Sequence, residues 1–171
     1  MQCLTPENAL VCELALQTGW RIDDCLRLRS EDLKKSKNKA QHYVTITEEK
    51  TGKKSTKRLS KSLFERLNTN KGAVFVFQGR DDITKHRTRQ AVWSDLKRAR
   101  KALRLKPNLS PHSTRKSYAV DLLQKSGGDL DKVQRALNHC KQSDTLIYAL
   151  ADTYTALKSR ARAKNAHTSA R

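Results

Sequence analysis

The stretch HYVTITEEKTGKKSTKRLS (residues 42–60) decides the fold class, because it interrupts a chain that is otherwise patterned as helices. Residues 42–47 are rich in β-branched and aromatic side chains and predict a strand, and residues 55–59 predict the returning strand. The sequence KTGK at 50–53 between them is typical of a turn. A third short strand is predicted at residues 73–77. We therefore expect an α+β fold, mostly helical, with a small three-stranded antiparallel sheet on one edge.

Helices are predicted on both sides of this hairpin. Thr5 and Pro6 suit a helix start, as a capping residue followed by proline at the first helical position, and Gly19 suits the end of that helix. A second short helix begins beside Arg21. Further helices are predicted from residue 88 to the end of the chain, marked by the apolar residues of 92–103, by residues 113–126, and by the capping residues Asp129 and Ser143.

The composition indicates a polyanion as the partner. The chain has 171 residues, which suits one domain, and its 36 Lys and Arg against 17 Asp and Glu give a formal net charge of +19. The positive charge is spread along the chain, so a folded basic surface that binds nucleic acid is favoured over a basic arm. No segment approaches the roughly 18 to 20 apolar residues that a membrane span needs, and no signal peptide opens the chain.

The cysteines indicate a reduced protein. They show no CxxC spacing, which argues against a zinc site and favours an intracellular location; they are Cys3, Cys12, Cys25 and Cys140. Cys12 and Cys25 lie within apolar patterns, where a free cysteine behaves as a small hydrophobic residue.

Five residues together indicate phosphoryl transfer on a DNA backbone; they are Arg21, His112, Arg115, His139 and Tyr148. Two arginines can clamp the non-bridging oxygens of a phosphate, a histidine can move protons near neutral pH, and a tyrosine can attack phosphorus. Each residue alone also has an ordinary interpretation: a surface arginine, a histidine that caps a helix end, a tyrosine in the core. The ordered set on a basic chain favours the chemical interpretation.

Four segments resemble the tyrosine recombinases, the phage integrase family. Residues 18–28 (TGWRIDDCLRL) and 111–119 (PHSTRKSYA) are similar to the two arginine boxes of that family. Residues 137–148, which begin LNHC and end TLIY, are similar to its closing box with the nucleophile, and residues 50–53 to its mobile lysine turn. The resemblance extends from residue 5 to about 155. This chain departs from the family pattern where the family usually has glycine, serine and proline, at Asn138, Cys140 and Ser60.

The resemblance implies a role for each of the five residues. Tyr148 would attack the scissile phosphate and form a 3′-phosphotyrosyl link. Arg21 and Arg115 would neutralise the charge that develops on the non-bridging oxygens. His112 would act in proton transfer near the nucleophile, and His139 would hydrogen-bond the phosphate. The covalent link conserves the bond energy for religation, so the resemblance implies no metal and no cofactor.

The resemblance also implies roles for other polar residues. Lys50 would be the general acid that protonates the departing 5′ oxygen, and Asp24 would help to orient the site. Lys53 and Lys54 lie on the same turn and could take the place of Lys50; as exposed lysines they also suit a solvated turn or a DNA groove. The expected DNA-binding residues are Lys53, Lys54, Arg89 and Lys116.

As a whole the resemblance implies the catalytic domain of a site-specific DNA integrase or recombinase, at residues 1–155. Residues 156–171 form a basic tail that is either exchanged between protomers or frayed. The expected partner is double-stranded DNA, bound by a tetramer on paired sites, with a monomer without DNA, in the cytoplasm of a bacterial host. Other hypotheses are a recombinase that resolves chromosome dimers, a type IB topoisomerase-like enzyme, or a non-catalytic basic DNA-binding module of the same fold. Full-length members also have an N-terminal core-binding domain, so the resemblance implies that this sequence is the catalytic domain alone.

Overall fold

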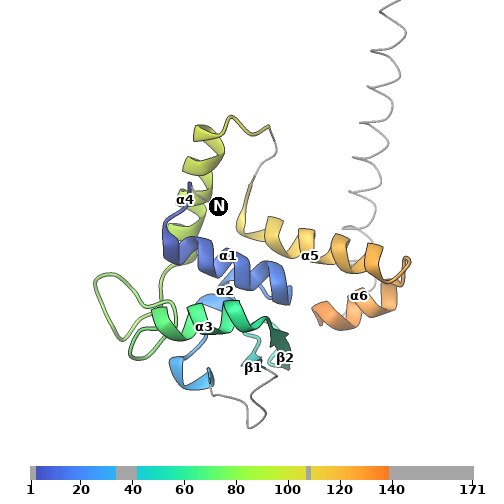
Figure 1. The fold of residues 1–171 in the computed structure, drawn as a ribbon, viewed down its shortest axis with the longest axis horizontal. Coiled ribbons are helices and arrows are strands. Elements are labelled where there is room, and N and C mark those ends of the chain that lie inside the picture. The colour runs from blue at the N-terminus through green and yellow to red at the C-terminus, as the bar shows by residue number, and fades with distance from the viewer. Residues whose placement is uncertain (1–2, 34–41, 107–108, 139–171) are drawn as a thin grey trace, which may run out of the picture. The chain divides into compact units, whose positions relative to one another are not determined.

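The computed structural model describes residues 3–33, 42–106 and 109–138 (Figure 1). The chain divides into two compact units, residues 1–118 and 119–171. The described elements are, in order, α1 (Pro6–Thr18), α2 (Ile22–Leu26), the 3-10 helix η1 (Ser30–Asp32), β1 (His42–Thr47), β2 (Lys54–Leu59), α3 (Lys61–Asn70), α4 (Arg89–Ala102), α5 (Pro111–Lys125) and α6 (Leu130–Leu137).

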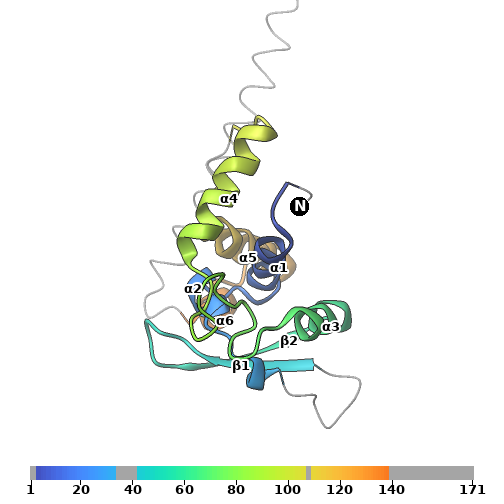
Figure 2. The same cartoon turned by 90° about the vertical axis from the view of Figure 1, so that its left-hand side faces the viewer.

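Helix α1 is the central element of the first unit. It contacts α2, α3, α4 and β2, and Figures 1 and 2 show it beside α2 and α3. Because it has neighbours on several sides, α1 buries residues along its whole length, among them Val11, Leu14 and Ala15. These side chains form one hydrophobic core with residues of α2, the hairpin and α3, including Cys25, Leu26, Val44, Leu59, Leu63 and Leu67.

The ends of α1 follow local sequence signals. Pro6 occupies the first turn, and Gly19 ends the helix with φ of 74° while its N–H donates to the carbonyl of Ala15. The predicted cap is wrong in one respect: the Thr5 side chain does not cap α1. Both its hydroxyl and its amide donate to the Asp95 carboxylate of α4, and this contact turns the hydroxyl toward α4 instead of toward the free amides of the helix end.

The predicted hairpin is confirmed. Strands β1 and β2 pair antiparallel, with His42 opposite Leu59 and Thr47 opposite Lys54. The turn between them is closed by two backbone bonds: the Gly52 amide donates to the Glu48 carbonyl at 2.8 Å, and the Glu48 amide donates to the Lys53 carbonyl at 3.0 Å. Gly52 has φ of 65°, a conformation that glycine adopts without a steric penalty. Figure 2 shows the hairpin with α3 next to it.

The predicted third strand is wrong, because within the described residues the sheet has two strands. Residues 73–77 instead hydrogen-bond to the segment that follows α2: the Ser30 amide donates to the Val74 carbonyl, and the Val76 amide donates to the Leu28 carbonyl. An isolated bridge joins Arg29 and Phe75. The run is apolar because Val76 and Phe77 are buried in the core. Helix α3, which the sequence analysis did not predict, separates β2 from this run.

The later helices begin close to their predicted positions. The Thr88 side chain caps α4 by accepting from the Ala91 amide, and Asp129 caps α6 by accepting from the Lys132 amide. Helix α5 begins at Pro111, two residues before the predicted start. The helix predicted from Ser143 lies outside the described residues. Of the helices that the structure describes, none has the length and apolar character needed to cross a membrane.

Candidate phosphate-binding site

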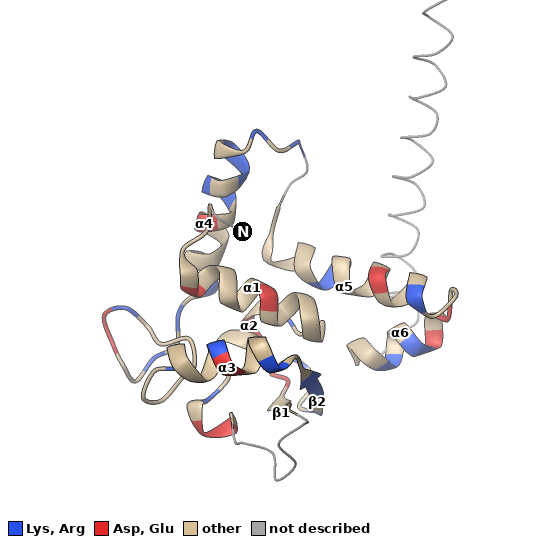
Figure 3. Cartoon of the chain, viewed as in Figure 1, with Lys and Arg blue, Asp and Glu red and all other residues tan. Residues whose placement is uncertain are grey.

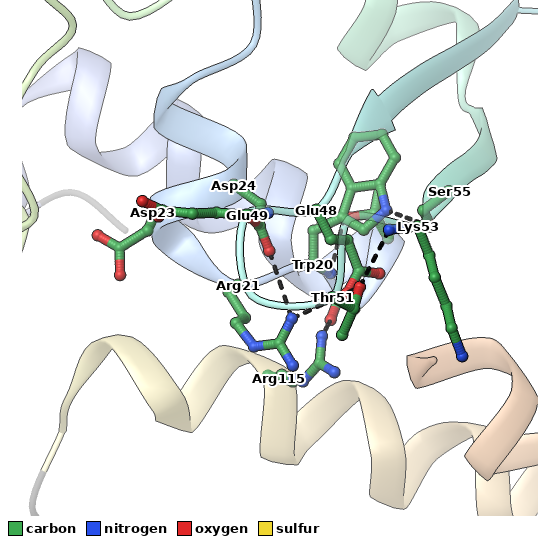
Figure 4. A network of polar contacts seen from close by, with 12 residues as sticks. Trp20, Arg21, Asp23, Asp24, Glu48, Glu49, Thr51, Lys53, Ser55 and Arg115 are labelled. Atoms are coloured by element: carbon green, nitrogen blue, oxygen red, sulfur yellow. Dashed lines mark hydrogen bonds and ion pairs between the residues drawn. The ribbon is translucent and has the colours of Figure 1, made fainter. Parts of the chain in front are cut away.

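Arg21 lies at the start of α2, two residues after Gly19, which ends α1. Its Nη1 is 2.9 Å from Oε2 of Glu48 and 3.6 Å from Oδ2 of Asp24 (Figure 4). Both carboxylate side chains are 2% exposed, whereas the Arg21 side chain is 21% exposed. Arginine has five N–H donors, so contacts through Nη1 leave other donors for a ligand. The two buried carboxylates therefore hold the Arg21 guanidinium in place, and part of the Arg21 side chain remains accessible to a ligand.

Trp20 fixes the backbone next to Arg21. The indole is 1% exposed, and its Nε1–H donates to the Ser55 hydroxyl of β2 at 2.8 Å. The Trp20 amide donates to the Thr18 hydroxyl, which itself donates to the carbonyl of Leu14 in α1. This chain of contacts connects α1, the residue before Arg21 and the hairpin.

Asp24 lies beside Arg21, where the sequence analysis expected an orienting acid. Its Oδ1 accepts from the Glu49 amide at 3.0 Å, and its Oδ2 accepts no hydrogen bond from the part of the chain that the structure describes. Burial raises the pKa of Asp24 above its ordinary value, and the Glu49 amide and the Arg21 guanidinium offset only part of that rise. Asp24 therefore lies beside the Arg21 guanidinium, and its Oδ2 has no hydrogen-bond donor among the described residues.

Glu48 is a residue of this site that the sequence analysis missed. It follows β1, and its Oε2 accepts from Arg21 Nη1 at 2.9 Å and from the Thr51 hydroxyl at 3.3 Å. Period-two alternation after Val44 and Ile46 would have placed position 48 on the buried face. That signal was available, since a glutamate on a buried face needs a cationic partner.

Arg115 reaches the same region from α5. It is 3% exposed, and its Nη1 donates to the Gly19 carbonyl at 2.7 Å. Gly19 is two residues before Arg21, so one short segment carries the first arginine and anchors the second. A Cβ at Gly19 would overlap the ring of Tyr118, one turn after Arg115, so only glycine lets α5 approach this closely. The sequence prediction that Arg21 and Arg115 converge is consistent with this arrangement.

Lys57 of β2 is a second residue that the sequence analysis missed. It is half-buried, and its Nζ lies 5.7 Å from the centroid of the Tyr118 ring. Burial lowers the pKa of Lys57; the negative charge of Glu48 opposes that effect and the positive charge of Arg115 adds to it. Lys57 therefore lies within electrostatic range of both. Its inward orientation depends on the strand register, which the sequence analysis did not use.

His112 lies three residues before Arg115, in the first turn of α5. Partial burial lowers the pKa of His112; the positive charge of Arg89 lowers it further, and Asp23 opposes both effects. Arg115 and Arg21 also lower it. The lowered pKa favours the neutral imidazole, which can accept a proton. The prediction that His112 and Arg115 lie on one helix is confirmed, and their roles stay predictions.

Of the hairpin lysines, Lys50 and Lys53 lie on the turn, and Lys54 is the first residue of β2. Lys50, Lys53 and Lys54 are exposed, and Lys50 makes no hydrogen bond or ion pair with any residue that the structure describes. The Lys53 amide donates to the Thr51 hydroxyl at 3.4 Å. Arg89 pairs with Asp23 at 3.4 Å, and Lys116 is half-buried in α5. The roles of these residues stay predictions.

His139 and Tyr148 lie outside the described residues. Within residues 3–33, 42–106 and 109–138, no three His, Cys, Asp or Glu side chains come together as a metal site. Cys12 and Cys25 are buried, and burial raises the pKa of the Cys12 thiol to about 11, so that thiol stays protonated.

The described site carries more positive than negative charge. Three cations, Arg21, Lys57 and Arg115, stand against two carboxylates, Asp24 and Glu48. Figure 3 shows Lys and Arg on the hairpin and on several helices, so the charge is spread, as the composition predicts. An arginine pair in a partly buried site with a net positive charge suits a phosphate or another oxyanion.

Comparisons with known proteins agree with this geometry. A model of the phage integrase family matches residues 2–154. The integrase of Escherichia phage P2 is 27% identical over 149 residues, which are 87% of this chain and 39% of that protein. The tyrosine recombinase XerD of Oceanobacillus iheyensis is 30% identical over 155 residues, which cover 85% of this chain and 50% of the relative. The chain thus spans about half the length of the curated relatives it matches or less.

Solved structures share the fold. The site-specific recombinase XerH, bound to the palindromic difH substrate in a post-cleavage complex, has a TM-score of 0.67 at 20% identity, covering 92% of this chain and 47% of XerH. The catalytic domain of bacteriophage HP1 integrase has a TM-score of 0.56 at 19% identity, covering 84% of this chain and 74% of that domain. The chain therefore belongs to the phage integrase family and has the fold of a tyrosine recombinase catalytic domain.

Proposed function

We propose that this chain is the catalytic part of a site-specific DNA recombinase or integrase, which cuts and rejoins DNA through a 3′-phosphotyrosyl intermediate. The observation that carries the proposal is the convergence of Arg21 and Arg115 on the segment Gly19–Arg21, in a site with a net positive charge. The names of the relatives support it, since the phage P2 protein is an integrase and the XerD protein is a tyrosine recombinase.

The two arginines act on the phosphate. Each is anchored before DNA arrives, Arg21 by Glu48 and Arg115 by the Gly19 carbonyl. Anchored donors need little reorganisation when charge develops on the non-bridging oxygens, so they bind the transition state more tightly than the ground state. Phosphoryl transfer depends mostly on positioning and charge stabilisation of this kind.

The chemical step balances with residues of this chain. The Tyr148 oxygen attacks phosphorus and forms the new bond, while the bond from phosphorus to the 5′ oxygen breaks. A proton goes to the departing 5′ oxygen from Lys50, or from Lys53 or Lys54 of the same hairpin. His112, whose lowered pKa favours the neutral imidazole, takes the proton that Tyr148 loses, and His139 donates a hydrogen bond to the phosphate. Religation is the reverse reaction, so it needs no metal or cofactor.

The proposed partner is double-stranded DNA, in keeping with the charge of +19. The proposal includes a tetramer on paired sites, a monomer without DNA, a catalytic domain at residues 1–155 and a basic tail at 156–171. The cytoplasm of a bacterial host is the proposed location. Both integrases and XerD proteins occur among the relatives, so a chromosome-dimer recombinase is the second candidate. DNA affinity should fall steeply as salt rises; a flat log–log plot against salt would contradict this.

The decisive experiment captures the covalent intermediate. The protein is incubated with a pool of nicked suicide duplexes of randomised sequence, and adducts that resist denaturation are purified and sequenced. Wild type and Tyr154→Phe are expected to form the adduct, and Tyr148→Phe is not. An adduct that persists in Tyr148→Phe would refute the proposed nucleophile. DNA binding without any adduct in wild type would favour the non-catalytic DNA-binding module.

A further inference from the structure

We infer that Glu48 is a positioning residue that holds Arg21 and the Lys50-bearing turn in one fixed arrangement. The inference rests on the proposed function, because it assigns Glu48 a part in the strand cleavage proposed above. Glu48 is 2% exposed and follows β1, at the start of the turn of residues 48–53.

The Glu48 carboxylate links Arg21 to the turn through side-chain contacts. Oε2 of Glu48 accepts from Arg21 Nη1 at 2.9 Å and from the Thr51 hydroxyl at 3.3 Å (Figure 4). One oxygen therefore binds both the guanidinium of α2 and a side chain of the turn. Thr51 is the residue next to Lys50, so its position affects the direction in which Lys50 leaves the turn.

The Glu48 backbone makes a second link to the turn. The Gly52 amide donates to the Glu48 carbonyl, and the Glu48 amide donates to the Lys53 carbonyl, so Glu48 closes the turn at both of its peptide groups. The next amide, that of Glu49, donates to Asp24 Oδ1 at 3.0 Å. The base of the turn is thus attached to α2 at two places, through Arg21 and through Asp24.

Burial makes this attachment strong. A carboxylate that is taken out of water without a cation costs several kcal/mol, so the contact with Arg21 stabilises Glu48 in its buried position. Because Arg21 is 21% exposed and meets Glu48 through Nη1, the same guanidinium can bind a phosphate while it stays paired. The contact therefore orients Arg21 and need not break when DNA binds.

The test compares Glu48→Gln with Glu31→Gln. The control removes the same charge from another Arg–Glu pair, Arg29 Nε to Glu31 Oε1 at 2.8 Å, which is exposed. With the DNA selected above, single-turnover cleavage at saturating DNA by Glu48→Gln should fall on the order of 10- to 100-fold, the effect of misplacing a catalytic group. DNA affinity should be unchanged or tighter, since a negative charge is removed. Glu31→Gln should cleave as wild type does.

Two further measurements separate positioning from a general loss of stability. Amide hydrogen exchange in Glu48→Gln should accelerate at residues 49–53 and stay unchanged in α1 and α3. A substrate with sulfur at the 5′ bridging position, which leaves without needing a proton, should recover part of the rate, because some of the defect is misplacement of the Lys50 turn. Acceleration in every helix together with a loss of DNA affinity would show a merely structural role and overturn the inference.

The remaining outcomes are also decisive. Cleavage by Glu48→Gln at the wild-type rate, with unchanged exchange at 49–53, would overturn the inference while leaving the proposed function intact. If Glu48→Gln melts below the assay temperature, Glu48→Asp replaces it; the charge is kept but lies one methylene further from Arg21, and a rate equal to wild type would count against the inference. If wild type forms no adduct, the proposed function fails, and exchange at 49–53 still decides whether Glu48 holds the turn.

Discussion

Two buried carboxylate clusters in residues 1–118 differ in how completely they are hydrogen-bonded. In the Asp95 cluster (Thr5, Asn8, Asp95), the Asp95 carboxylate accepts from the Thr5 amide at 2.7 Å, the Thr5 hydroxyl at 3.0 Å and the Asn8 amide group at 2.9 Å. Arg98 also pairs with it. In the Arg21 cluster (Arg21, Asp24, Glu48), Asp24 Oδ2 accepts no hydrogen bond from the described residues.

The pKa directions agree with this difference. Burial raises the pKa of Asp95, but hydrogen bonds from Asn8 and Thr5 more than offset it, so the pKa lies below its ordinary value. Burial raises the pKa of Asp24, and its partners offset only part of that rise. The Asp95 cluster joins α1 to α4 and stabilises the fold. In the Arg21 cluster, Asp24 Oδ2 has no hydrogen-bond donor among the described residues, a feature that is more common at sites that bind ligands.

The largest expected effect is the loss of cleavage in Arg115→Ala. Removing a preorganised donor to developing negative charge should lower the single-turnover rate on the order of 100- to 1000-fold. Arg115→Lys should recover little of it, because a lysine cannot donate to Gly19 and to a phosphate with the fork geometry of a guanidinium. Adduct formation on the selected suicide duplex measures both. Full activity in Arg115→Lys would show that charge alone is needed.

The second largest expected effect is a difference in the free energy of unfolding between variants of the two clusters. Asp95→Asn should lower the free energy of unfolding by about 2 to 4 kcal/mol, because three donors lose their ionised acceptor. Asp24→Asn should lower it by about 1 kcal/mol or less, since the folded state already disfavours the Asp24 charge. Urea denaturation at neutral pH measures both values. If both variants lost the same free energy of unfolding, the two clusters would not differ in how much they stabilise the fold.

The pH dependence of these variants has opposite signs. The Asp95 pKa is lowered on folding, so its contribution is present above the unfolded value of about 3.9 and is lost as pH falls through the folded pKa. The Asp24 pKa is raised, so its ionisation costs stability at neutral pH, and that cost disappears as pH falls through the folded pKa. The free energy of unfolding of each Asn variant minus that of wild type can be plotted between about pH 7 and pH 3. The slopes of this difference should therefore be opposite for Asp95→Asn and Asp24→Asn.

The smallest expected effect concerns His112. Burial and the charge of Arg89 lower its pKa, so cleavage should decline only below the ordinary titration range of histidine. Arg89→Ala removes one of these causes, so the acid limb should move to higher pH while the plateau rate at saturating DNA stays the same. A pH–rate profile of adduct formation checks this. An unmoved limb would show that another group limits the acid side.

Features with local causes could be predicted from the sequence. Gly19 ends α1, Thr88 and Asp129 cap α4 and α6, and residues 42–59 form the hairpin, because each signal acts within a few residues. The Thr5 cap failed because its side chain turns toward Asp95, ninety residues later, and accepts from no amide of the first turn. The third strand failed because a short apolar run does not indicate which segment it pairs with.

The residues of the candidate site also fall into two groups, those that the sequence predicted and those that it did not. Arg21, Asp24, His112 and Arg115 were found because their order and spacing resemble a family pattern. Glu48 and Lys57 were missed because each is an ordinary charged residue in the hairpin, and only the approach of α5 and α2 to that hairpin makes it part of a site.

The sequence by itself determined the fold class, the ends of most helices, the hairpin and the family, since these depend on local propensity, periodicity and residue order. Only the tertiary structure decided that Arg21 is anchored by Glu48 and Arg115 by the Gly19 carbonyl. The physical reason is that a buried charge needs a partner, and the partner is chosen by which elements pack together rather than by nearness in the chain.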